Sequence, residues 1–85
     1  MSDWKIVWTS AARRDLDRLS REEQQRIRAA LGKLASDPRT ADCKKLQGNP
    51  PRWRLRVGEW RVVFTLDRAE KQIHITEVFN RQQGY

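Results

Sequence analysis

An alternation of apolar and basic residues on either side of a Gly-Glu pair restricts the fold more than any other feature of the sequence. In the run Trp53–Val57 the apolar side chains alternate with Arg54 and Arg56, which is the period of a strand with one buried face. A second apolar run, Trp60–Leu66, follows Gly58-Glu59. A two-residue loop that opens with glycine is typical of a type II′ turn, so we predict a β-hairpin with one apolar and one basic face.

The predicted register of this hairpin brings like charges together. If the turn has two residues, Val57 faces Trp60 on the apolar side. The same register sets Arg56 directly opposite Arg61, with Arg54 one pair further along. Opposed like charges cost a sheet roughly a few tenths of a kcal/mol or more, so folding alone gives no reason to keep them. Either both side chains splay into water, where screening reduces the cost, or an anion binds between them through charge-assisted hydrogen bonds.

The charge of the whole chain agrees with an anionic partner. The sequence has 85 residues, enough for one domain (1–85), and a net charge of +7. Residues 44–85 carry nine basic and four acidic side chains, a net of +5, and residues 1–43 carry nine and seven, a net of +2. A basic face of this kind favours a nucleic acid or an acidic protein as partner. A solvated basic surface with no ligand is the alternative.

Several classes of protein are disfavoured by composition. A single cysteine, Cys43, cannot form an internal disulfide, and one His with one Cys cannot make a closed structural zinc site. We predict no metal and no cofactor. The N-terminus lacks a long apolar run, so we expect neither a signal peptide nor a membrane span, no membrane as partner, and a cytoplasmic protein.

The remaining elements follow from local signals. Trp4–Trp8 reads as a first strand, and Thr9 or Ser10 can cap a helix after it. Ser20 with Glu23 forms a capping-box pattern, which predicts a second helix through about Ala35.

The second half of the chain continues with strands. Residues 39–52, rich in Gly and Pro, read as a connector. After the hairpin, residues 67–70 form a turn before a last strand, Gln72–Phe79. The predicted order is β-α-α-β-β-β, an α+β domain in which a helical hairpin covers one face of an antiparallel sheet.

Three segments in this order resemble the RelE/ParE family of toxins from bacterial toxin–antitoxin pairs. Lys44–Gly48 is similar to the family's K-L-x-G segment, and Trp53–Phe64 is similar to its run Y/W-R-x-R-x-G-x-Y/W-R-V-x-Y/F. Val78–Tyr85 is similar to its basic C-terminal segment with Arg and Tyr. The resemblance covers almost the whole chain and implies the family's fold, which is like that of microbial ribonucleases.

For the RelE branch, the resemblance implies a metal-independent endoribonuclease that cuts messenger RNA on the ribosome and stops translation and growth. The ribose 2′-hydroxyl attacks the adjacent phosphate in that reaction. The resemblance matches Arg54 and Arg56 to two basic residues of the hairpin strand, Arg61 to the phosphate-contacting Arg, Arg81 to the C-terminal Arg and Tyr85 to the catalytic Tyr. We add Lys44, Lys45 and Arg52 as candidate RNA-binding residues.

Departures from the family pattern keep alternatives open. Ribosome-dependent relatives often have Lys where this chain has Arg54 and Arg56, and Arg cannot serve as a base because its pKa is above about 12. A ParE-like inhibitor of DNA gyrase without nuclease chemistry is the second interpretation, and a domain that only binds its antitoxin is the third. Both toxin branches imply a cognate antitoxin, with operator DNA bound only through that antitoxin.

Overall fold

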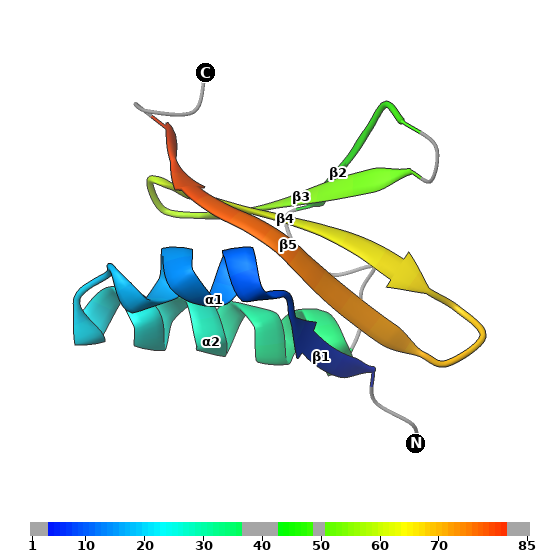
Figure 1. Ribbon diagram of the computed structural model, residues 1–85, viewed down its shortest axis with the longest axis horizontal. Coiled ribbons are helices and arrows are strands. Elements are labelled where there is room, and N and C mark those ends of the chain that lie inside the picture. Colours follow the sequence, from blue (N-terminus) through cyan, green and yellow to red (C-terminus); the bar gives the residue numbers. More distant parts are fainter. Residues whose placement is uncertain (1–3, 37–42, 49–50, 82–85) are drawn as a thin grey trace.

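The computed structural model describes residues 4–36, 43–48 and 51–81, which form two layers (Figure 1). A twisted five-stranded sheet has the order β1-β5-β4-β3-β2, and two helices pack on one of its faces. Within these ranges, no helix is long and apolar enough to cross a membrane. The elements in chain order are β1 (Lys5–Trp8), α1 (Ser10–Asp17), α2 (Arg21–Ser36), β2 (Cys43–Leu46), β3 (Arg52–Val57), β4 (Trp60–Asp67) and β5 (Gln72–Asn80).

The helical hairpin begins and turns where the sequence predicts. The Thr9 side chain caps α1 and accepts a hydrogen bond from the backbone N–H of Ala12 at 3.2 Å. Ser20 and Glu23 form the predicted capping box, in which each side chain accepts from the other's backbone N–H, at 3.1 and 3.0 Å. These bonds satisfy amide groups that a helix start otherwise leaves unpaired.

The core lies between the helices and the apolar face of the hairpin. The predicted register is confirmed, because Val57 pairs with Trp60 and Leu55 pairs with Val62. The turn between them has Gly58 at φ 59°, as the first loop residue of a type II′ turn requires. The largest fully buried side chains are Phe64, Leu16, Ile27, Leu34, Ile73, Ile75 and Val62.

The prediction of a wholly antiparallel sheet is wrong at one edge. β1 pairs with β5 in parallel, with Lys5 opposite Gln72 and Trp8 opposite Ile75. Both helices and three strands separate β1 from β5 in the chain, so no local signal in either strand fixes their relative direction. The α+β class and the position of the helical layer are confirmed.

The prediction that residues 39–52 form only a connector is wrong as well. Cys43–Leu46 forms strand β2, which pairs antiparallel with β3 at the other edge of the sheet. The observed order is therefore β-α-α-β-β-β-β. Four residues are too few for an alternation signal, and the pairing with β3 is what makes them a strand.

Glu23 also ties the helical layer to the sheet. Its Oε2 accepts a hydrogen bond from Nε1 of Trp60 at 3.1 Å, in addition to the capping bond. The hydrogen bonds from the Ser20 backbone and side chain, and then the one from Trp60, lower the pKa of Glu23 below its ordinary value of 4.5. The charged carboxylate is therefore the form that the folded state favours.

We expect the stability of Glu23→Gln to fall less steeply at acid pH than the stability of the wild type. Because the folded pKa is lowered, the contribution of Glu23 is complete above the unfolded value of 4.5 and is lost as pH falls through the folded pKa. Urea midpoints followed by Trp fluorescence, measured from pH 6 down to about pH 3, should fall less steeply in the variant. Glu70→Gln, an exposed turn residue, is the control. If the urea midpoints of wild type and Glu23→Gln fall equally steeply with pH, the lowered pKa of Glu23 is contradicted.

Candidate functional site

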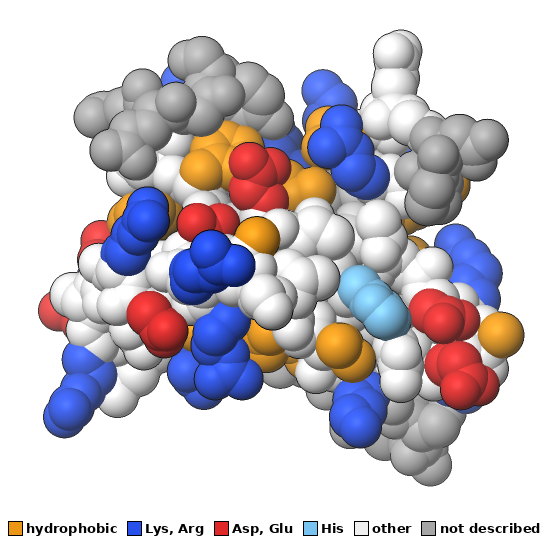
Figure 2. Space-filling view, in the orientation of Figure 1, with side chains coloured by type: hydrophobic (Ala, Val, Ile, Leu, Met, Phe, Trp, Pro, Cys, Tyr) orange, Lys and Arg blue, Asp and Glu red, His pale blue; other side chains and the backbone are white. Residues whose placement is uncertain are grey.

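The sheet face turned away from the helices carries the arginines of the hairpin. Arg56 lies opposite Arg61, as the sequence predicts, and Arg54 lies opposite Val63. Side chains alternate along a strand, so these three arginines point away from the core that holds Leu55 and Val62. The helical layer also carries basic side chains, but there they are interspersed with acidic ones (Figure 2).

The two arginines of β3 differ in exposure. Arg56 is exposed, whereas Arg54 is half-buried and its Nε has no hydrogen-bond partner among the described residues. Arg54 also pairs across the ladder with Lys44 of β2. The cross-strand row Lys44–Arg54–Val63 ends at Glu77 of β5, which is exposed and adds one acidic side chain to this face.

Arg61 is held inside the hairpin. Only 6% of its surface is exposed, and its Nη1 donates hydrogen bonds to the backbone oxygens of Gly58 at 3.0 Å and Trp60 at 3.1 Å. Its cross-strand neighbour on β5 is Phe79. The repulsion predicted between Arg56 and Arg61 is thus reduced, because the guanidinium group of Arg61 donates to backbone carbonyl oxygens.

Arg81 lies beside the same turn. Its backbone N–H donates to the carbonyl oxygen of Glu59 at 2.8 Å, and the residue is exposed. Backbone placement therefore brings Arg56, Arg61 and Arg81 to one end of the sheet. Tyr85, the other predicted catalytic residue, lies outside the described residues.

The predicted RNA-binding residues divide between the two faces. Arg52 and Lys44 lie on the arginine side of the sheet, and both are exposed. Lys45 pairs with Trp53 and lies on the helix side, with its Nζ 6.0 Å from the centroid of the indole ring. The structure therefore separates Lys45 from the other basic residues of the hairpin.

His74 shares the arginine side of the sheet but lies toward the other end. It pairs with Thr65 and with Val7, and its Nε2 is 2.9 Å from Oε1 of Gln72. Over the ranges described, no three His, Cys, Asp or Glu side chains gather as metal ligands.

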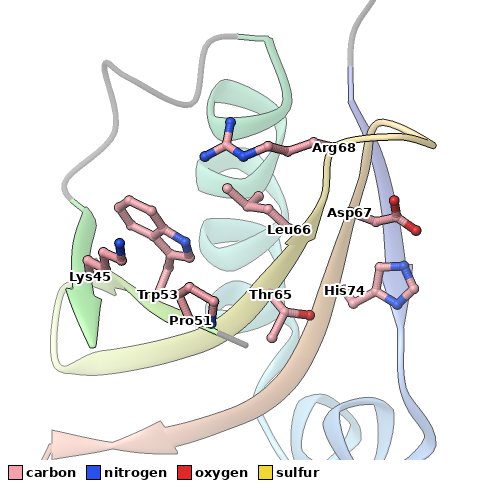
Figure 3. A pocket seen from close by; sticks show the side chains of 8 residues that line it. All are labelled: Lys45, Pro51, Trp53, Thr65, Leu66, Asp67, Arg68 and His74. Carbon is pink, nitrogen blue, oxygen red and sulfur yellow. The ribbon is translucent and has the colours of Figure 1, made fainter. Parts of the chain in front are cut away.

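A groove of about 560 Å³ opens at the end of the sheet away from Arg81 (Figure 3). Trp53 and Leu66 point toward one another there, and Lys45 and Arg68 add positive charge. Its residues come from four separate stretches of the chain, so no local sequence signal could have revealed it. The lining consists of Lys45, Pro51, Trp53, Thr65, Leu66, Asp67, Arg68 and His74.

The family of the chain follows from comparison with known proteins. A family model described as the ParE toxin of the type II toxin–antitoxin system parDE matches residues 6–85. The chain belongs to the RelE/ParE toxin family. The match extends over the arginine face, the turn and the C-terminal segment. The comparison with curated proteins gave no match.

Solved structures of toxins share the fold. RelBE2 of Mycobacterium tuberculosis is 25% identical over 95% of this chain and 94% of that one, with a TM-score of 0.82. The archaeal RelE–RelB complex of Pyrococcus horikoshii is 21% identical over 96% and 99%, with a TM-score of 0.81. The YoeB/ParE toxin of Agrobacterium tumefaciens is 18% identical over 89% and 96%, with a TM-score of 0.76.

These matches confirm the predicted family and fold. The protein is therefore a toxin of a type II toxin–antitoxin system. RelBE2 was solved as a toxin–antitoxin complex, and the archaeal RelE as a complex with RelB. The arginine face remains the candidate site of this toxin.

Proposed function

We propose that the toxin is a metal-independent endoribonuclease that cuts messenger RNA on the ribosome and thereby stops translation and growth. The supporting observation is the arrangement of Arg54 and Arg56 on the sheet face that the helices leave uncovered, with the backbone of Arg81 bound to the hairpin turn at the end of that sheet. Arg56 and Arg81 are exposed at the same end of the sheet, and we propose that they contact one phosphate there. Lys44 and Arg52, on the same side, would hold flanking phosphates of a single strand.

The proposed reaction suits a site made of guanidinium groups. The ribose O2′ forms a bond to the adjacent phosphorus, and the bond from phosphorus to O5′ breaks. The products are a 2′,3′-cyclic phosphate and a 5′-hydroxyl. Negative charge builds on the phosphoryl oxygens in the transition state, and fixed guanidinium donors stabilise that charge.

Proton transfer needs a group other than arginine. A proton leaves O2′ and another arrives at O5′, but a guanidinium with a pKa above about 12 releases none at neutral pH. By resemblance to the family, Tyr85 is our candidate for this role. Nearby cations would lower the pKa of its phenol from about 10 and make the phenolate more accessible.

Cleavage on the ribosome can be tested with one defined message. We expect purified toxin, added to an in vitro translation reaction, to produce new 5′-hydroxyl ends at discrete codons, detected by primer extension. The same message without ribosomes should stay intact, because the reaction is proposed to depend on the ribosome. Arrested translation with an uncut message would contradict the proposal.

Inhibition of DNA gyrase is the second candidate function. The matching family model, which carries the ParE name, favours it. A supercoiling assay with purified gyrase separates the two candidates, because a gyrase inhibitor should block supercoiling and leave messages uncut.

A further inference from the structure

We propose that Arg61 is a positioning residue and not a phosphate ligand. It holds the turn at Gly58-Glu59, from which Arg56 and Arg81 are presented to the substrate. The inference rests on the proposed function for the role of Arg56 and Arg81. The role of Arg61 itself is argued from contacts within the protein.

The contacts of Arg61 are directed inward. Its Nη1 bridges the carbonyl oxygens of Gly58 and Trp60, at 3.0 and 3.1 Å, and only 6% of the residue is exposed. Arg56, its cross-strand partner, is exposed. Nη1 of Arg61 is therefore already bound to two carbonyl oxygens, and a phosphate that took this donor would leave both oxygens without it.

The turn that Arg61 holds also anchors Arg81. The carbonyl of Glu59, between the two carbonyls that Arg61 binds, accepts from the backbone N–H of Arg81 at 2.8 Å. Three successive carbonyl groups, 58 to 60, therefore bind either the side chain of Arg61 or the backbone of Arg81. If the turn loosens, the start of the segment that carries Arg81 loses its anchor.

The same network continues into the helical layer. Trp60, whose carbonyl oxygen binds Arg61, donates from Nε1 to Glu23 at 3.1 Å, and Glu23 belongs to the capping box of α2. The turn is therefore fixed from both faces of the sheet, by Arg61 on one and by Trp60 on the other. Gly58 adopts φ 59°, which glycine tolerates without strain, and because glycine restricts the backbone so little, the two contacts are what hold the turn in this shape.

Salt dependence of RNA binding distinguishes a positioning residue from a phosphate ligand. Each phosphate contact on a single strand contributes about 0.7 to the slope of log K against log salt. We compare Arg61→Met with Arg56→Met, because the two positions face each other and methionine keeps an apolar stem. With a short single-stranded RNA, Arg56→Met should lower the slope by about 0.7. Arg61→Met should leave the slope unchanged and weaken binding at every salt concentration, because Arg81 keeps its charge beside the RNA but is held less firmly. An equal reduction by Arg61→Met would overturn the proposal.

Amide hydrogen exchange gives a readout that does not depend on RNA. Arg61→Met should speed exchange of the Arg81 amide at least tenfold while amides of β4 and β5 stay protected, and Arg56→Met should leave it unchanged. Wild-type exchange of the Arg81 amide in Arg61→Met would reject the positioning role. If Arg56→Met leaves the salt slope unaltered, the proposed RNA site is wrong, yet the exchange result still decides the role of Arg61.

A measurement on the unmodified toxin covers the case in which Arg61→Met does not fold. The NMR signals of the Arg61 guanidinium should show restricted rotation in the free protein and should not shift when the RNA oligonucleotide is added. Free rotation without RNA, or a large shift on RNA binding, would overturn the proposal.

Discussion

Replacing Arg56 and Arg81 together by alanine is expected to abolish growth arrest and to leave the fold intact. Both residues are exposed, so truncation creates no cavity and should cost little stability. Loss of a donor that stabilises transition-state charge typically reduces the rate by about 10² to 10³. Viable counts after induction, at matched expression, measure the effect, and co-purification with the antitoxin checks that the variant is folded.

A matched control distinguishes loss of the arginine site from a general loss of positive charge. Arg14 and Arg28 are exposed on the two helices, and alanine at both positions removes the same charge from the opposite layer. That control should remain toxic. Full toxicity of the Arg56→Ala, Arg81→Ala double variant would reject the arginine face as the site. Arg61→Ala is less informative, because removal of a buried side chain also disturbs the turn.

Phe64→Ala should give the largest loss of stability of any single truncation considered. Phe64 is 1% exposed and pairs with Trp53 on one side and Ile75 on the other, at the centre of the sheet. Removing a buried Phe side chain costs about 3–5 kcal/mol, a large part of the total stability of about 5–15 kcal/mol usual for one domain. Chemical denaturation of purified protein measures the difference.

Phe79→Ala is the control for that loss, because Phe79 is the second phenylalanine of the chain and is only half-buried on the other face. Its truncation should cost clearly less. Equal destabilisation by the two substitutions would mean that the outer face contributes as much to the core as the helix-covered face.

Local signals were sufficient to predict much of the fold. The capping box at Ser20 and the hairpin turn at Gly58 involve residues a few positions apart, so their chemistry can be read directly from the sequence. Strand β2 was not predicted, because its four residues become a strand only by pairing with β3. The parallel direction of β1 was not predicted, because it depends on pairing with β5, which is far away in the sequence.

The candidate site was predicted in part for the same reason. Alternation placed Arg54, Arg56 and Arg61 on one face, and the register confirms that arrangement. Alternation gives a direction but not an exposure, so the burial of Arg61 on the carbonyls of its own turn was not foreseen. Lys45 was grouped with Lys44 by sequence, although adjacent residues of a strand point to opposite faces.

The parallel pairing of β1 with β5 has a consequence for synthesis of the toxin. The Thr9 side chain at the end of β1 donates a hydrogen bond to the backbone oxygen of Ile75, 66 positions later, so this contact closes a long loop of chain and can form only after Ile75 has been made. This edge of the sheet forms only once residues 72–75 have left the ribosomal exit tunnel. A polypeptide truncated before Ile75 would therefore lack the pairing of β1 with β5 and, with it, this edge of the sheet.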